Sequence, residues 1–234
     1  MVQSLSIGIV GDYSDTVIAH KAIPLALNKA AAALGLTIKL VWLETASLSS
    51  DRIECDAIWL APGSPYVDAN RVLEVIRTAR EQHLPLMGTC GGCQHMLLEW
   101  ARNVLGWKDA THAEFETGGR QVISSLVCSL INVKQEIRLK PKTHLYSAYA
   151  GRNAIQATYQ CSYGINPEYS EALFTTGELV VSAENAEGEP RGFELTTHPF
   201  YVATMFQPER NALESSPVPL ADALLAAAAA RKPR

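Results

Sequence analysis

Cysteine and glycine gather in one short stretch that could carry a nucleophile. The stretch reads Gly88-Thr-Cys-Gly-Gly-Cys-Gln94 and follows an apolar run at residues 84–87. A nucleophile flanked by glycines between a strand and a helix is typical of enzymes that attack a carbonyl carbon, because larger neighbours would collide in so sharp a turn. Cys90 takes the nucleophile position here. Free N–H groups at the start of the following helix favour a thiolate, so we expect a lowered pKa for Cys90.

The same stretch supports a second hypothesis. Cys90-Gly-Gly-Cys93 is a C-x-x-C motif at the start of a helix, where two thiols can exchange with a disulfide. Cys93 is then the candidate redox partner of Cys90. A neutral substitution at Cys93 accounts for the motif equally well. In either case the backbone N–H of Gly91 points toward the position of an oxyanion on an attacked carbonyl.

Alternating strands and helices must position this turn. Apolar runs, a helical spacing of alanine and leucine, and an N-cap at Asp68 predict a parallel sheet that is covered on both faces. After residue 118 short strand-like pieces separated by Gly, Pro and Asn predict an antiparallel insertion. No linker divides the chain, so we expect one domain over residues 1–234. Strands are predicted at 5–10, 37–43, 56–61, 84–87, 121–127, 136–139, 155–159 and 201–206, and helices at 17–34, 68–82, 92–105 and 220–231.

Composition excludes several classes of function. The chain has 234 residues and a net charge of −4, which gives no support for a nucleic-acid partner. No apolar run reaches the roughly 18 residues of a membrane span, and the first residues lack the pattern of a signal peptide. We therefore expect no membrane association and a cytoplasmic location. Five scattered cysteines favour reduced thiols over structural disulfides. We expect neither a metal nor a cofactor.

Four segments, in order, resemble one family over nearly the whole chain. They are Pro62-Gly63, the stretch from Gly88 to Val104, Thr111-His-Ala-Glu-Phe115, and the segment ending Phe206-Gln-Pro-Glu209. Together they resemble the class I glutamine amidotransferases, and in particular the C-terminal glutaminase domain of CTP synthase. The resemblance implies an α/β fold with a doubly wound, mostly parallel sheet flanked by helices and an antiparallel extension. It also implies a Cys–His–Glu triad that hydrolyses glutamine to glutamate and ammonia.

The resemblance assigns a role to individual residues. It implies Cys90, Gln207 and Glu209 at the triad positions, with Gln207 as a polar substrate contact or an orienting contact tied to Glu209. It places the amides of Gly91 and Ser64 at the oxyanion. The residues that it implies at the substrate are Gly63, Gln94, Glu114 and Tyr163.

Three departures from the family fall in this pocket. Gln207 stands where the family has histidine, and an amide cannot take up a proton near neutral pH. The piece Gln160-Cys-Ser-Tyr163 lacks the family arginine that holds the glutamine carboxylate. The oxyanion loop reads Gly63-Ser-Pro65 where the family has more glycines, and Pro65 has no N–H to donate. A carboxylate without a partner binds poorly in a closed pocket. We therefore expect weak glutamine hydrolysis, and little rescue by Gln207→His alone while Ser162 carries no charge.

These observations predict a protein that uses Cys90 on a small amide, imide or ammonia-bearing substrate other than glutamine. One alternative is a catalytically inactive binding or regulatory domain. Another is a thiol redox protein that uses Cys90 and Cys93. The resemblance does not extend to a synthetase half, so we expect a small-molecule substrate together with either a homo-oligomer or a separate synthetase-type partner.

Overall fold

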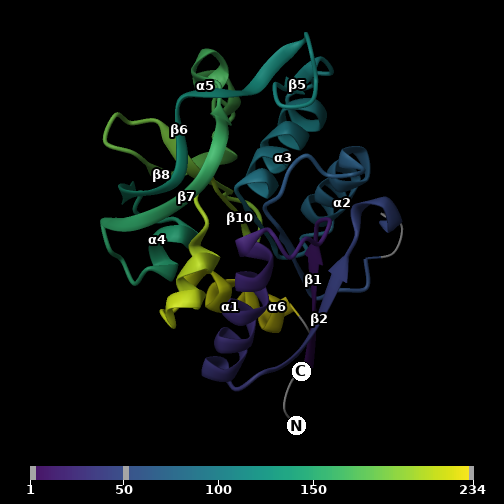
Figure 1. Cartoon of the computed structure of the whole chain (residues 1–234), viewed down its shortest axis with the longest axis vertical. Helices are drawn as coiled ribbons and strands as arrows, with labels where there is room; N and C mark the ends of the chain where they lie inside the picture. The colour runs from purple at the N-terminus through teal and green to yellow at the C-terminus, as the bar shows by residue number, and fades with distance from the viewer. Residues whose placement is uncertain (1–3, 50–52, 232–234) are drawn as a thin grey trace.

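Five parallel strands form the centre of the sheet. The computed structural model describes residues 4–49 and 53–231. Within them the strands lie in the order β2-β1-β3-β4-β10, and each pairs with its neighbour in parallel. The mostly parallel α/β sheet predicted from the sequence is thereby confirmed (Figure 1). These strands are β1 (Ser4–Val10), β2 (Thr37–Leu43), β3 (Ala57–Leu60), β4 (Leu86–Thr89) and β10 (Tyr201–Thr204).

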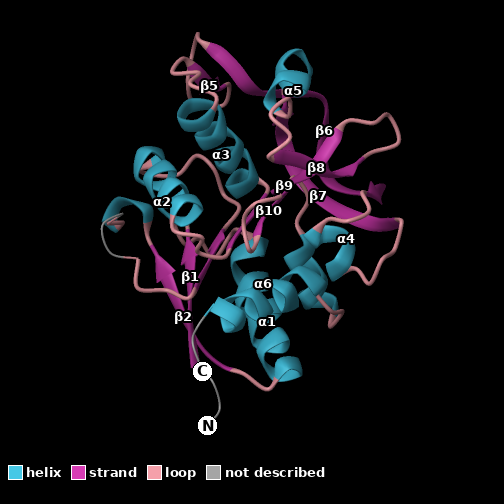
Figure 2. Cartoon of the chain, turned by 180° about the vertical axis from the view of Figure 1, so that it is seen from behind, coloured by secondary structure: helices cyan, strands magenta, loops and turns pink. Residues whose placement is uncertain are grey.

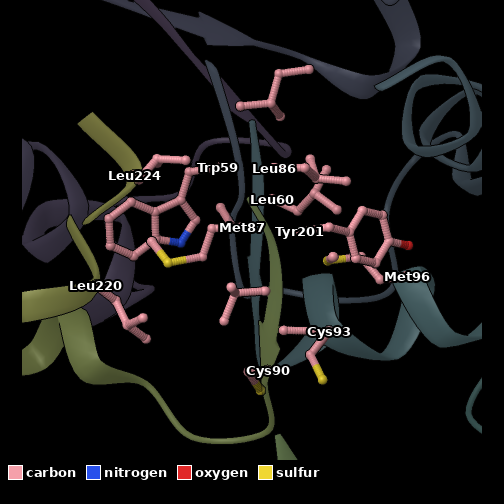
Figure 3. Packing of buried hydrophobic residues seen from close by; sticks show 14 of the residues in the cluster. Trp59, Leu60, Leu86, Met87, Cys90, Cys93, Met96, Tyr201, Leu220 and Leu224 are labelled. Atoms are coloured by element: carbon pink, nitrogen blue, oxygen red, sulfur yellow. The ribbon is translucent and has the colours of Figure 1, made fainter. Parts of the chain in front are cut away.

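Helices cover both faces of this sheet (Figure 2). On one face lie α1 (Ile18–Leu34) and α6 (Pro219–Arg231), and on the other lie α2 (Ala69–Glu81) and α3 (Gly91–Glu99). Successive side chains of a strand point to opposite faces, so one strand supplies both layers of the core. Trp59 lies on the side of Leu224 from α6, whereas Leu60 lies on the side of Met96 from α3 (Figure 3).

The helix boundaries follow local rules that the sequence displays. The predicted N-cap of α2 is confirmed, since the Asp68 side chain accepts a hydrogen bond from the N–H of Arg71. Gly35 ends α1 in the left-handed conformation. The helix predicted at 92–105 is α3 followed by a π-helical segment, Trp100–Val104. No helix in the described part of the chain is both long enough and apolar enough to cross a bilayer.

An antiparallel extension continues the sheet beyond β10, as predicted. It runs from β9 (Pro190–Leu195) through β8 (Leu179–Glu184) to β6 (Arg120–Leu139), which pairs with β7 (Ala154–Ile165) and with β5 (Ala110–His112) at the edge. The two separate pieces predicted at 121–127 and 136–139 belong to one strand. The register of the pairing between β6 and β7 shifts at two places, but β6 continues through both. Strands β5, β8 and β9 were not predicted. Neither were α4 (His144–Ala148), α5 (Pro167–Leu173) and the short 3₁₀ segments Thr45–Ser47 and Pro208–Glu214.

Candidate active site

Cys90 occupies the turn between β4 and α3 in a strained backbone conformation. Its φ is +51° and its ψ is −112°, a combination that residues with a side chain rarely adopt. The Cys90 N–H donates to the carbonyl of Thr204 on β10 at 2.9 Å, which ties the turn to the sheet. A Cβ on Gly92 would lie 2.4 Å from the carbonyl oxygen of Leu60, so only glycine lets α3 start this close to β3. The turn predicted from the glycine spacing therefore forms.

A cavity of about 360 Å³ opens at this turn. It receives Cys90 from one end of the parallel sheet and residues of β6 and β7 from the antiparallel extension. The structure thus brings together parts of the chain that are more than a hundred residues apart. Most of the predicted site residues line it, namely Gly63, Ser64, Cys90, Gln94, Glu114, Tyr163 and Gln207.

The predicted oxyanion donors lie side by side. A Cβ on Gly91 would lie 3.2 Å from the backbone nitrogen of Ser64, which shows how closely the two backbone segments approach. Gly63 has a φ of +109°, a conformation that favours glycine. The Ser64 hydroxyl donates to Glu114 Oε2 at 2.9 Å and fixes that carboxylate at the cavity. The two segments that carry the predicted oxyanion donors are therefore in close contact beside Cys90.

A second thiol lies against the first. Cys161 on β7 places its Sγ 3.3 Å from the Sγ of Cys90, which also contacts the carbonyl oxygen of Gln160 at 3.4 Å. Both cysteines line the cavity and are buried, with 7% of Cys90 and 6% of Cys161 exposed. The sequence hypothesis did not include Cys161. Its place in the short piece that aligns with the substrate side of the family pocket was the available signal.

The thiol pair reverses the predicted titration of Cys90. Its hydrogen bond to Cys161 and its burial raise the pKa of the Cys90 thiol well above its usual value. The bond accepted from Cys90 lowers the pKa of Cys161 against the opposing effect of burial. The expectation of a lowered Cys90 pKa is therefore wrong. The helix N-terminus favours a thiolate, but burial and donation to a second sulfur outweigh it.

A chain of hydrogen bonds aims an amide at Cys161. The N–H of Glu114 donates to His112 Nδ1 at 3.2 Å, and the other ring nitrogen, Nε2, lies 3.0 Å from Gln94 Oε1. Burial lowers the pKa of His112 to about 3, so the ring is neutral and its Nε2–H donates. Gln94 Nε2 is consequently directed at Cys161 Sγ (3.1 Å) and at the carbonyl of Tyr163 (3.0 Å). Gln94 therefore donates to the sulfur of Cys161, and the carbonyl of Tyr163 helps to hold the Gln94 amide in the cavity wall.

Gln207 and Glu209, which were predicted at the remaining triad positions, contact different groups. Gln207 is buried beside Cys90, and the hydrogen bond from its side chain opposes the rise in the Cys90 pKa. Glu209 is fully buried, accepts from the hydroxyl of Thr89 at 3.2 Å, and has no partner for Oε2 among the described residues. The expected bond between Gln207 and Glu209 is not among the contacts of the described residues. Burial raises the pKa of Glu209 to about 8, so its carboxyl is mostly protonated at neutral pH.

Arg210 brings a positive charge to the cavity that the sequence hypothesis missed. Its guanidinium contacts three amide oxygens, those of Asn132 (3.2 Å), Gln207 (3.4 Å) and Gln160 (3.5 Å). Among the described residues no carboxylate forms an ion pair with it. It lines the same cavity as Ser162, the position that lacks the family arginine. A guanidinium held only by neutral acceptors can still pair with an anion.

The proposed redox partner Cys93 faces away from Cys90. Its thiol is completely buried in α3 and contacts the sulfur of Met205 at 3.4 Å. The two labelled cysteines in Figure 3 direct their sulfurs to different places. The strained φ of Cys90 turns its side chain toward β7, whereas the helical geometry of α3 turns Cys93 into the core. The contact predicted for Cys93 is made by Cys161 instead.

Metal ligation has no support among the described residues. Nowhere in residues 4–49 and 53–231 do three or more His, Cys, Asp or Glu side chains converge in a way that could hold a metal ion.

Comparisons with known proteins place this arrangement in context. A family model described as "Glutamine amidotransferase class-I" matches residues 19–227. The CTP synthase of Caldivirga maquilingensis is 32% identical over 245 residues, and the CTP synthase of Saccharolobus solfataricus is 29% identical over 235 residues. These alignments cover 97% and 93% of this chain but only 45% and 44% of the two relatives. The chain therefore spans less than half the length of these relatives.

Solved structures show the same fold. The glutaminase domain of a Trypanosoma brucei CTP synthase, solved with bound acivicin, superposes with a TM-score of 0.88 at 20% identity. The match covers 98% of this chain and 96% of that one. A glutamine amidotransferase from Thermotoga maritima superposes with a TM-score of 0.59 at 10% identity and covers 97% of both chains.

Proposed function

The chain belongs to the class I glutamine amidotransferase family and is similar to part of CTP synthase, and from its cavity we propose that it uses Cys90 to release ammonia from a small amide or imide. Glutamine is hydrolysed inefficiently. The observation that carries this proposal is the strained Cys90 in the wall of the cavity. Strain of this kind is kept where the surrounding structure holds a reactive group in place. The paired backbone segments at Ser64 and Gly91 support a carbonyl substrate, since they suit an oxyanion.

The thiol pair supplies a proton acceptor in place of the family histidine. Cys161, as the thiolate that its lowered pKa favours, takes the proton of Cys90 across 3.3 Å while the sulfur of Cys90 attacks the carbonyl carbon. As the C–N bond breaks, Cys161 returns the proton to the departing nitrogen. Water then cleaves the thioester and frees Cys90. Gln207 stabilises the thiolate through its amide but moves no proton.

Arg210 favours substrates that carry a carboxylate or another anionic group. The family arginine is absent at Ser162, yet the guanidinium of Arg210 lines the same cavity. Glu114 lies at the cavity with its carboxylate held by Ser64, so a cationic group of the substrate could bind there. The two charges together favour a small zwitterionic or anionic amide.

The charge of Arg210 gives a testable selectivity. We expect Arg210→Gln to raise the KM for a carboxylate-bearing amide such as glutaramate by about tenfold to hundredfold, because a hydrogen bond to a charged group contributes about 1.5–3 kcal/mol. The KM for neutral butyramide should stay unchanged. Steady-state ammonia release with both substrates measures this. Equal losses for the two substrates would show that Arg210 supports the fold of the pocket and does not recognise the carboxylate.

Ammonia release from a panel of small amides and imides tests the proposed function. The panel includes glutamine, glutaramate, succinimide and butyramide. We expect release from at least one member, abolished in Cys90→Ser, reduced in Cys161→Ser and retained in Cys93→Ala, whose sulfur lies outside the cavity. Labelling with iodoacetamide in a Cys128→Ser background should reach the cavity thiols before Cys93. If no substrate gives ammonia that depends on Cys90, the proposed amide chemistry fails, and a catalytically inactive binding domain or a thiol redox protein takes its place.

The synthetase-type partner stays a prediction. Ammonia released at Cys90 can serve as a nitrogen donor, and the similarity of the chain to part of CTP synthase favours a separate synthetase-type protein as its acceptor. Co-purification with the ammonia-dependent partner, followed by ammonia transfer assays, tests this.

A further inference from the structure

Two thiols that come from distant parts of the chain share one wall of the cavity. Cys90 starts α3 and Cys161 lies on β7, 71 residues later, and their sulfurs are 3.3 Å apart. A disulfide needs a sulfur separation of about 2.05 Å, so a further approach of about 1.3 Å would complete the bond. Both residues line the cavity, so a small oxidant can reach them. Neither the triad chemistry nor the substrate contacts of the family require this second thiol.

The surroundings of Cys161 are built to hold a sulfur that accepts hydrogen bonds. Gln94 Nε2 donates to it at 3.1 Å, and the direction of this amide is fixed because His112 donates to Gln94 Oε1. Cys90 donates to the same sulfur. Hydrogen bonds to sulfur favour the thiolate, which is the form that reacts with peroxides and disulfides. The pair therefore combines a nucleophilic sulfur with a second thiol in contact.

We propose that Cys90 and Cys161 form a reversible disulfide, which makes the cavity a site of two-electron thiol oxidation by hydroperoxides. The Cys161 thiolate attacks an oxygen of hydrogen peroxide, the O–O bond breaks, and hydroxide leaves and is protonated to water, so that a sulfenic acid remains. The sulfur of Cys90 then attacks this sulfur and expels the second water. Two thiols lose two electrons, and one peroxide becomes two waters. A dithiol reductant reverses the reaction by thiol–disulfide exchange.

This inference is independent of the proposed amide chemistry. The disulfide removes the thiolate that would attack a carbonyl, so the oxidised protein should release no ammonia. If the disulfide forms but the reduced protein releases no ammonia, the proposed function fails and this inference stands. If ammonia is released but no disulfide forms, the reverse holds.

The test compares three forms of the full chain. Wild type, Cys161→Ser and Cys93→Ala are treated with hydrogen peroxide, blocked with N-ethylmaleimide and digested without reductant, and the peptides are mapped by mass spectrometry. In wild type and Cys93→Ala we expect one cross-link between the Cys90 and Cys161 peptides that dithiothreitol removes. In Cys161→Ser we expect no cross-link and a Cys90 that stays reduced or stops at an unpaired oxidation state.

Three results would overturn the proposal. A cross-link between Cys90 and Cys93 would restore the interpretation based on the sequence motif. Oxidation of Cys90 to sulfinic acid in wild type without a cross-link would show that the two sulfurs do not meet. A cross-link that dithiothreitol does not remove would exclude a reversible disulfide. Circular dichroism of each variant confirms that the proteins compared are folded.

Discussion

Gln207→His is expected to raise kcat/KM for glutamine by about 10²–10⁴-fold, the usual contribution of a positioned general base. Residue 207 is buried beside Cys90, so an imidazole there can take up the thiol proton directly. Glu209 Oε2 has no partner among the described residues, and an imidazole that gains a proton would favour the ionised form of this carboxyl, which accepts a hydrogen bond. The triad would then have all its members.

This expectation differs from the one drawn from the sequence. Without an arginine at Ser162, the sequence predicted that a restored base would still face a substrate carboxylate with no partner. The structure brings Arg210 to the same cavity, and the acceptors of its guanidinium among the described residues are amide oxygens. A carboxylate bound there is balanced, so base and carboxylate site are both present in Gln207→His.

The experiment compares ammonia release from glutamine by wild type and three variants. Gln207→His should be active, Gln207→His with Arg210→Gln should lose most of the gain through a raised KM, and Gln207→His with Ser162→Arg should gain little more. If Gln207→His stays at the wild-type rate while the variant with Ser162→Arg becomes active, Arg210 does not hold the carboxylate and the sequence expectation is correct. Vigorous hydrolysis by wild type would refute the need for a base at residue 207.

The free energy of unfolding is expected to fall as pH rises, because of Glu209. Burial raises the pKa of this carboxyl to about 8 in the folded protein, against 4.5 for an ordinary glutamate. The folded state therefore holds a proton that the unfolded state releases above about pH 4.5. The contribution to stability is complete below pH 4.5, declines between pH 4.5 and 8, and is lost above pH 8. A pKa shift of this size lowers the free energy of unfolding by roughly 3–5 kcal/mol between pH 4.5 and pH 8.

Glu209→Gln isolates this effect, because the amide keeps the shape of the side chain and has no charge to titrate. Urea unfolding at pH 5 and pH 8.5 should show a smaller loss of stability in Glu209→Gln than in wild type. Glu187→Gln, which changes an exposed carboxylate, should behave as wild type. Identical losses in wild type and Glu209→Gln would show that the buried carboxyl is ionised in the folded protein. The variant with histidine at residue 207 should lose less stability at high pH than wild type, since an imidazole stabilises the Glu209 carboxylate.

The sequence alone determined the turn, the parallel part of the sheet and most of the cavity wall. Local rules decide these features. The glycines around Cys90 permit a strained turn, Asp68 caps a helix, and apolar runs of the right length form buried strands. The resemblance to a family then placed Ser64, Gln94, Glu114 and Gln207 in one pocket, where the structure also has them. Strands β8 and β9 were not predicted, and in β9 Pro190 and Gly192 interrupt the apolar pattern.

Only the tertiary structure decided which groups touch Cys90. Cys93 is three residues away in sequence, yet the helix turns its sulfur to Met205. Cys161 is 71 residues away, and the pairing of β7 with β6 at the end of the sheet brings it to 3.3 Å. Arg210 reaches the cavity because the segment after Gln207 folds back along β7. Strand pairing over long separations sets such distances, and no local pattern records them. The raised pKa of Glu209 likewise comes from burial, which depends on every element packed around it.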